Sequence, residues 1–389
     1  MEPMRKKSST KEDELLIQLQ INPDPRERKA AAYELSSNLT KKVVKTLVKA
    51  LKREKEGLVR RQIVWSLRFT SSRRVINALI DVLHNDPFSA VREQAIDSLG
   101  WIKDDVAIPA LFSALNQDKD LIVRQQAVKT LAIFGSKEHL ADLISVLQSS
   151  KEVNLRKTIV QVLPKIGLTD AVNPLIEIAN QDPSDKVRLL AIQALGEIGS
   201  KTALLDLITL LNNEENPLIR QQIVRAISDI NPQEALQPLL EVLKNDPDER
   251  VREEIAKAIS VIKSKEVIDA LLEITKKEDK SLVRETAVES LGLLKAKKSK
   301  KQLMKLLQSD PNIGVRRQAL AALRRIDGYE ATNDIAKTLF KILEKDLAKK
   351  ENSDLILCRM IINSLSELNL NSSQRQTLEK FMTQCNIRL

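Results

Sequence analysis

Apolar residues recur along most of the chain in a pattern that repeats every 32 residues. Each repeat contains two groups of apolar residues spaced three and four apart, which is the spacing of one face of an α-helix. In one repeat the second group is Val123, Ala127, Val128, Leu131 and Phe134. The first group centres on a leucine that recurs at nine positions: Leu47, Leu79, Leu111, Leu143, Leu175, Leu207, Leu239, Leu271 and Leu303. Each repeat therefore predicts a hairpin of two helices.

An arginine stands thirteen residues after each of these leucines, near the start of the second helix. The series is Arg60, Arg92, Arg124, Arg156, Arg188, Arg220, Arg252, Arg284 and Arg316, and Arg28 extends it by one repeat. Acid-proline pairs mark the join between the two helices. We expect their Asp to cap the second helix and their Pro to occupy its first position. The pairs are Asp86-Pro87, Asp182-Pro183, Asp246-Pro247 and Asp310-Pro311.

A single hairpin of this length cannot bury its apolar face, so neighbouring hairpins must stack on one another. The prediction is an all-α protein, a right-handed α-solenoid of about ten helical hairpins with a 32-residue period. We divide the chain into a disordered basic tail at residues 1–10, the array at 11–328 and a divergent C-terminal cap at 329–389. Thr10 and Asp13 form a candidate capping box for the first helix. In the cap, Cys358 takes the place of the arginine, and a final helix begins near Ser372.

The repeated arginine calls for a repeated partner. An acidic residue stands six positions before most of the arginines, with Ser150 as the exception. Stacked hairpins would bring each acid close to the arginine of its own or the next repeat, in a series of charge-assisted hydrogen bonds. Because a catalytic arginine would occur once, we interpret this arginine ladder as structural. Its central members are Asp86, Arg92, Asp118, Arg124, Asp182, Arg188, Asp246, Arg252, Asp310 and Arg316.

The combined motif resembles a known repeat family. An acid near the turn, often followed by Pro, then Val-Arg-x-x-Ala and a later Leu, is similar to HEAT repeats, in particular the short bacterial type named after phycocyanobilin lyase subunits. The resemblance extends from about Lys11 to Leu389. Proteins with such repeats include scaffolds, chromophore-lyase subunits, a DNA glycosylase group and a di-iron hydroxylase, so the resemblance implies an architecture rather than a function.

Candidate catalytic chemistry is sparse. The hydroxylase relatives bind iron through several His-Glu pairs, whereas this chain has only two histidines, His84 and His139, in different repeats. Two isolated histidines do not make a metal site. The sequence also has no Gly-rich phosphate loop, no Cys-x-x-Cys pair and no evident Ser/His/Asp set. We therefore expect no catalytic residue, no metal and no cofactor, and we interpret the protein as not an enzyme.

One departure from the repeat pattern predicts a binding site. Trp65 stands five residues after its arginine, at a position where most other repeats have polar or charged residues, and we expect it to be exposed. Phe69 and Trp101 stand nine residues after theirs. An exposed aromatic cluster with a basic rim is typical of an interaction hot spot or a nucleic-acid stacking platform. The predicted site comprises Trp65, Phe69, Trp101, Arg61, Arg68, Arg73 and Arg74.

Charge is distributed unevenly along the chain. Residues 1–75 have a net charge of +10, residues 76–294 a net charge of −9, and residues 295–389 a net charge of +9. Two basic ends around an acidic middle argue against a polyanion that follows the whole array. The C-terminal end predicts a secondary basic site, made up of Lys297, Lys298, Lys300, Lys301, Arg317, Arg324 and Arg325.

Together these features favour a protein-interaction scaffold or adaptor that presents a concave surface to a macromolecular partner, most simply a protein with an acidic surface. A nucleic-acid-binding protein that uses the basic aromatic N-terminal third is one alternative, and a bilin lyase subunit or chaperone is another. The two cysteines suggest a reducing compartment, and no apolar run approaches the roughly 20 residues of a membrane span. We expect a cytoplasmic protein without membrane contact, in an oligomeric state that the sequence does not indicate.

Overall fold

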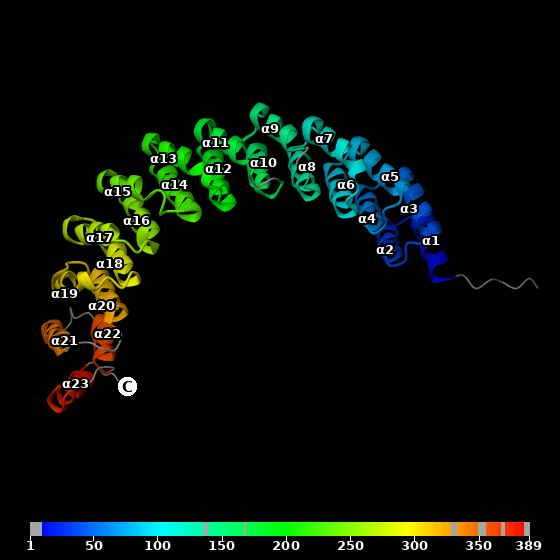
Figure 1. Ribbon diagram of the computed structural model, residues 1–389. Coiled ribbons are helices and arrows are strands. Elements are labelled where there is room, and N and C mark those ends of the chain that lie inside the picture. The colour runs from blue at the N-terminus through cyan, green and yellow to red at the C-terminus, as the bar shows by residue number, and fades with distance from the viewer. Residues whose placement is uncertain are drawn as a thin grey trace, which may run out of the picture. The chain divides into compact units, whose positions relative to one another are not determined.

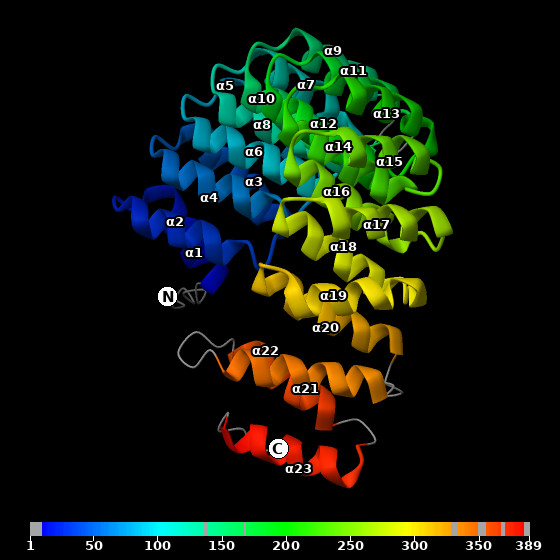
Figure 2. The same ribbon diagram turned by 90° about the vertical axis from the view of Figure 1, so that its left-hand side faces the viewer.

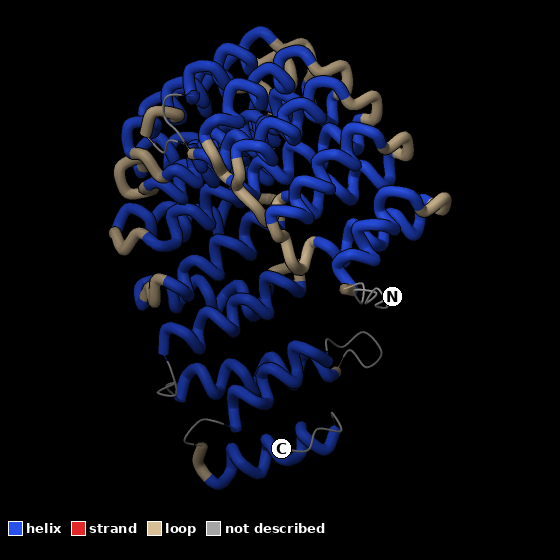
Figure 3. Tube along the Cα trace, turned by 90° about the vertical axis from the view of Figure 1, so that its right-hand side faces the viewer, coloured by secondary structure: helices blue, strands red, loops and turns tan. Residues whose placement is uncertain are grey.

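The structure is a computed structural model that describes residues 10–135, 139–166, 169–327, 333–348, 355–366 and 370–384. Within these ranges the chain forms helices and connecting loops and no strand (Figure 3). The chain divides into two compact units, Met1–Ile198 and Gly199–Leu389. The all-α class predicted from the apolar pattern is therefore confirmed, whereas the right-handed turn and the domain boundaries stay predictions.

The first unit consists of paired helices (Figure 1). A short 3-10 helix, Asp105–Ala107, directly precedes α7. The α-helices are α1 (Lys11–Ile21), α2 (Pro25–Leu35), α3 (Lys41–Arg53), α4 (Gly57–Leu67), α5 (Arg73–Asn85), α6 (Ser89–Ile102), α7 (Ile108–Gln117), α8 (Leu121–Phe134), α9 (Leu140–Ser149), α10 (Val153–Ile166), α11 (Val172–Gln181) and α12 (Asp185–Ile198).

The second unit continues the pairing and ends in the divergent cap. Its described part also contains 3-10 helices at Lys201–Ala203, Ile259–Val261 and Lys297–Ser299, which precede α13, α17 and α19. The α-helices are α13 (Leu204–Asn213), α14 (Pro217–Ile230), α15 (Leu236–Asn245), α16 (Glu249–Ala258), α17 (Lys265–Lys277), α18 (Ser281–Leu293), α19 (Lys300–Ser309), α20 (Ile313–Asp327), α21 (Asn333–Leu347), α22 (Leu355–Ser366) and α23 (Ser372–Gln384).

The regular spacing of the second helices explains how the hairpins stack. From α2 at Pro25 to α20 at Ile313, each even-numbered helix begins 32 residues after the one before it. In the first unit, α2, α4, α6 and α8 pack side by side in chain order (Figure 2). The nine repeated leucines all lie on the odd-numbered helices, and each is at most 1% exposed. Burying a leucine contributes about 2 kcal/mol, so the leucine column is a main source of cohesion between the layers.

The ends of the array follow the sequence expectations where the structure describes them. Thr10 caps α1, and the predicted capping box with Asp13 is present. Near the C-terminus, Cys358 is fully buried on α22, and the final helix begins at Ser372. Residues 1–9, which we predicted as a disordered tail, lie outside the described residues.

The role predicted for the acid-proline pairs is wrong. Asp86 ends α5 as its C-cap, and α6 begins only at Ser89, so Pro87 lies in the turn. The side chain of Asp86 accepts the backbone N–H of Phe88, two residues further on, at 3.0 Å. This hydrogen bond shapes the turn between the helices. Its carboxylate also accepts two hydrogen bonds from Arg60 of the preceding repeat.

Candidate functional site

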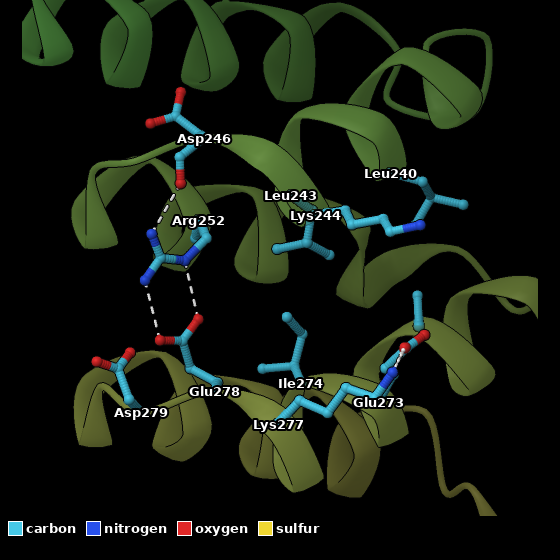
Figure 4. Close-up of a pocket in the computed structure, with 11 residues that line it drawn as sticks. Leu240, Leu243, Lys244, Asp246, Arg252, Glu273, Ile274, Lys277, Glu278 and Asp279 are labelled. Atoms are coloured by element: carbon cyan, nitrogen blue, oxygen red, sulfur yellow. Dashed lines mark hydrogen bonds and ion pairs between the residues drawn. The ribbon is translucent and has the colours of Figure 1, made fainter.

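Each rung of the arginine ladder joins two consecutive repeats. In Figure 4, Nε and Nη2 of Arg252 donate to the carboxylate of Glu278 at 2.8 and 2.9 Å, and Nη1 donates to the backbone carbonyl of Asp246 at 2.8 Å. Asp246 belongs to the same repeat as Arg252, whereas Glu278 belongs to the following one. One guanidinium therefore holds two inter-helix turns at a fixed distance, and its planar geometry suits this task.

The same arrangement recurs in both units. The acid lies 26 residues after its arginine in each case, and most of these side chains are largely buried. The bidentate pairs are Arg28–Glu54, Arg60–Asp86, Arg92–Asp118, Arg156–Asp182, Arg220–Asp246, Arg252–Glu278 and Arg284–Asp310.

The electrostatic environment favours the charged form of several ladder side chains. The pKa of Glu54 is lowered because Arg28 donates hydrogen bonds to its carboxylate, against the opposing effect of burial. Burial raises the pKa of Asp118, but the hydrogen bonds from Arg92 and from the backbone of Asp120 outweigh it and the pKa is lowered. The pKa of Arg252 is raised in turn by its hydrogen bonds to Glu278. The geometry agrees with a structural use of these groups, because their hydrogen-bonding atoms point at one another.

The expectation that each acid pairs with the arginine of its own or the next repeat is wrong, because these carboxylates accept from the arginine of the preceding repeat. The carboxylate of Asp182 is held by Arg156 of the preceding repeat, rather than by Arg188 of its own repeat. Arg188 donates to Asp185 on its own helix at 2.7 Å. Where Ser150 replaces the acid, Arg124 reaches Glu152, whose side chain is 44% exposed. The sequence pattern predicts an arginine and an acid at each join, but the choice of partner depends on how the repeats stack.

The predicted aromatic residues form a continuous row on α4, the turn that follows it and α6. Trp65 lies edge-to-face with Phe69 at a centroid distance of 5.1 Å, and Phe69 lies edge-to-face with Trp101 at 6.2 Å. The structure adds Tyr33, which stacks on Trp65 at 5.5 Å with an interplanar angle of 24°. We call these four residues the aromatic row.

Helical periodicity places the row on one surface. Trp65 and Phe69 are four residues apart, which puts them on one side of α4 and its C-terminal end. Tyr33 is five residues after Arg28, so it occupies on α2 the position that Trp65 occupies on α4. Tyr33, Phe69 and Trp101 are 58%, 47% and 62% exposed. Trp65 is half-buried rather than exposed, because Tyr33 and Phe69 pack against it.

The predicted basic rim is only partly assembled around the row. The guanidinium carbon of Arg68 lies 4.2 Å from the centroid of Trp101 and 5.9 Å from that of Phe69, which is cation–π geometry. Arg61 is exposed and precedes Trp65 by one helical turn. Arg73 and Arg74 begin α5, in the layer of first helices, and neither makes a cation–π contact among the described residues.

The secondary basic site is spread over several elements of the second unit. Lys297 and Lys298 lie in the 3-10 helix before α19, and Lys300 and Lys301 begin α19. Arg317, Arg324 and Arg325 lie on α20, in the other layer. Some of these charges are engaged: Lys298 pairs with Asp269, and Arg325 lies 3.7 Å from Glu289. The seven residues are near in sequence, but they do not share one element or one layer.

Cavities are shallow in both units. One of about 420 Å³ lies beside the ladder and is lined in part by Leu240, Lys244 and Ile274 (Figure 4). Another, of about 400 Å³, lies between α1 and α2 and includes Tyr33. Over the residues that the structure describes, no three His, Cys, Asp or Glu side chains are grouped as a metal site requires. The aromatic row is therefore the candidate functional site.

The family comparison matches nearly the whole array. The model for HEAT repeats matches residues 12–99, 76–164, 140–218, 172–260, 204–292 and 268–351, in overlapping segments. A comparison with curated proteins found no match. Within the described residues, none of the helices has the length and apolar character needed to cross a membrane.

Of three solved structures found by comparison, the two with the higher TM-scores come from larger proteins. A structure of Kap121p bound to Nup53p has a TM-score of 0.66 and 14% identity, over 95% of this chain and 46% of that one. A structure of Kap95p with RanGDP has a TM-score of 0.61 and 16% identity, over 96% and 56%. A third, the CpcE–CpcF complex of phycocyanin lyase from a Nostoc species, has a TM-score of 0.34 and 18% identity, over 67% and 98%. The chain thus spans about half the length of Kap121p and Kap95p, and at these identities the likeness concerns the fold alone.

Proposed function

The chain belongs to the HEAT-repeat family, and from this premise we propose that it is a non-catalytic scaffold or adaptor that binds a macromolecular partner. The binding surface is the exposed side of the second helices in the first unit, centred on the aromatic row. The partner is a protein. The observation that carries the proposal is the row itself, because three of its four rings are about half exposed or more in a chain whose other aromatic residues are few.

Exposed aromatic side chains of this kind are typical of binding hot spots. A large ring offers much contact area at little cost in side-chain entropy, and arginine beside it adds a charged rim. Here the rings also support one another, since each is within 6.2 Å of the next. A pre-organised row loses little conformational entropy when a partner binds, which favours affinity.

The arrangement of the rings favours a protein over a nucleic acid. A single-stranded nucleic acid binds by stacking its bases on open ring faces. Tyr33 covers one face of Trp65, and Arg68 lies over Trp101. Acidic residues such as Asp97 lie on the same helices, where they would repel phosphate. Similar folds also bind proteins, as the complexes of Kap121p with Nup53p and of Kap95p with RanGDP illustrate.

The proposal is tested by partner capture with a single variant. The wild-type protein is immobilised and used to capture a partner from the native host, and the partner is then purified for binding measurements. Trp65→Ala should weaken binding by about 2 kcal/mol or more, as expected for a hot-spot aromatic residue. Its melting temperature should change little, because Trp65 lies outside the fully buried core.

The matched control is Leu205→Ala, which removes an exposed apolar side chain from the second unit, 75% exposed in the structure. This variant should bind the partner as the wild type does. If Trp65→Ala binds normally but unfolds at a much lower temperature, the tryptophan serves the core, and the binding site must be sought elsewhere.

A further inference from the structure

The polar groups of the aromatic row and of Arg68 beside it can all donate hydrogen bonds. They comprise the hydroxyl of Tyr33, the indole N–H groups of Trp65 and Trp101, and the guanidinium of Arg68. Within the described part of the chain, none of these groups donates to another residue, and Nε of Arg68 is buried without an acceptor.

Two acidic residues on the helices that carry the row interact with other groups. Asp97, on the same helix as Trp101, accepts a hydrogen bond from Gln126. Glu34, the neighbour of Tyr33, is paired with Lys11 at 2.9 Å. A ligand that complements the row must therefore present apolar surface to the rings and acceptors to the donors along its length.

The backbone conformation of the ligand decides how well it meets this demand. A bound α-helix satisfies nearly all its carbonyl groups internally, so it offers apolar side chains but few acceptors. A β-strand needs donors and acceptors from a sheet edge, and the described part of the chain has no strand. A polyproline II segment has no internal hydrogen bonds, so its carbonyls are available, and proline rings pack well on aromatic side chains.

The dimensions of the row agree with such a ligand. The successive centroid distances are 5.5, 5.1 and 6.2 Å. At ~3.1 Å per residue, about five residues in polyproline II form would follow the row from end to end. The edge-to-face contacts at Phe69 also set neighbouring rings at steep angles of 82° and 76°, which leaves uneven relief between them instead of a flat platform.

We infer that the aromatic row binds a proline-rich segment of the partner in the polyproline II conformation, with its carbonyls accepting from Tyr33, Trp65, Trp101 and Arg68. This inference rests on the proposed function and specifies the chemistry of the partner. The segment lies across α2, α4 and α6, and the exposed Arg61 lies beside it, one turn before Trp65.

The chain carries its own reporter for a direct test. Its only two tryptophans are Trp65 and Trp101, so intrinsic tryptophan fluorescence observes the row alone. The full chain is titrated with an oligoproline peptide of about ten residues, which is long enough to cover the row in polyproline II form. We expect a saturable fluorescence change, and no such change with a glycine-serine peptide of equal length, which has the same carbonyls but no pre-formed conformation.

Two variants separate the donor groups from the rings. Trp65→Phe keeps an aromatic ring but lacks the N–H group, and Tyr33→Phe lacks the hydroxyl. Each should weaken oligoproline binding by up to about tenfold, the usual effect of one lost hydrogen bond. Ile133→Ala, which changes the exposed apolar residue at the next equivalent position on α8, should bind as the wild type does.

The outcomes distinguish this inference from the proposed function. If oligoproline gives no saturable change while the captured partner still depends on Trp65, the ligand class is wrong and the scaffold function stands. If oligothymidylate saturates the fluorescence and oligoproline does not, the surface binds nucleic acid and both proposals are overturned. Unchanged oligoproline binding in both phenylalanine variants would show that the donors play no part, and would overturn the assignment.

Discussion

Arg156 donates two hydrogen bonds to the carboxylate of Asp182, at 2.8 and 3.0 Å, across the boundary between two repeats. Both side chains are nearly buried, at 7% and 2% exposure. Nη1 of the same arginine donates to the carbonyl of Ser150 in its own repeat. Removing either partner would leave a charge in an environment from which water is largely excluded, and this makes the ladder a source of specificity in how the repeats stack.

The first prediction concerns the cost of breaking this pair. Arg156→Ala leaves Asp182 buried without its counter-ion, so we expect the free energy of unfolding to fall by about 3 kcal/mol. Arg124→Ala removes the equivalent arginine one repeat earlier, whose partner Glu152 has a side chain that is 44% exposed. Its cost should be about 1 kcal/mol. Urea unfolding followed by circular dichroism measures both, and equal losses would show that burial of the acid is unimportant.

The ladder also shows what could be predicted from sequence. The position of each arginine on a second helix followed from a local pattern that is repeated nine times, although the helices after the acid-proline pairs begin two residues beyond the proline. The partner of each arginine did not follow. In the seven bidentate pairs it lies 26 residues away in the next repeat, and that pairing depends on how the hairpins stack. For the same reason the Asp of each acid-proline pair was misassigned as a helix N-cap.

The second prediction concerns acid. The pKa of Glu54 is lowered from 4.5 in the folded state, chiefly because Arg28 donates hydrogen bonds to its carboxylate. A carboxyl group with a lowered folded pKa contributes stability that is present above its unfolded pKa and is lost as the pH falls through its folded pKa. We therefore expect stability to decrease below about pH 5, as protons bind more readily to the unfolded chain.

Glu54→Gln removes this titration, so its free energy of unfolding should decrease less than that of the wild type between neutral and acid pH. Arg28→Gln removes the cause of the lowered pKa and should reduce the pH dependence in the same direction. Urea unfolding at several pH values supplies the comparison. If the free energy of unfolding depends on pH in both variants as it does in the wild type, the linkage does not act through this pair.

The third prediction concerns a close approach between two second helices. A Cβ atom added to Gly292 on α18 would lie 2.8 Å from both Cα and Cβ of Ala322 on α20. Because backbone atoms cannot move aside easily, Gly292→Ala should push the helices apart and lower the free energy of unfolding by about 1–3 kcal/mol. Alanine's better helix propensity offsets part of this cost. Thermal unfolding of the purified variant provides the measurement.

Gly57→Ala is the matched control. Its added methyl would lie 3.3 Å from the side chain of Phe88, which is 54% exposed and free to move. We expect its stability to stay within about 0.5 kcal/mol of the wild type. Comparable losses in the two variants would mean that glycine itself, rather than the contact with Ala322, determines the effect.

The aromatic row was predicted in part, and the missing member is instructive. Trp65 was recognised because it interrupts a polar column counted from Arg60. Tyr33 occupies the same column counted from Arg28, so an earlier start to the count would have found it. The half-burial of Trp65 could not be predicted, because it results from Tyr33 and Phe69 packing on either side. Nor could the sequence distinguish Arg68, which lies over Trp101, from Arg73 and Arg74 in the other layer.

The final prediction concerns charge at the proposed binding surface. Arg61 is exposed, lies one turn before Trp65 on α4 and belongs to a region with a net charge of +10. A partner with an acidic surface would be attracted to it over about a Debye length, ~8 Å at physiological ionic strength. Arg61→Glu should therefore slow association several-fold and make the association rate less dependent on salt, while dissociation changes little.

Lys301→Glu makes the same change of charge at the C-terminal basic end and should leave the association rate as it is. Binding kinetics at several salt concentrations measure both effects. If Lys301→Glu slows association and Arg61→Glu does not, the partner binds the second unit, and the aromatic row is not its docking surface.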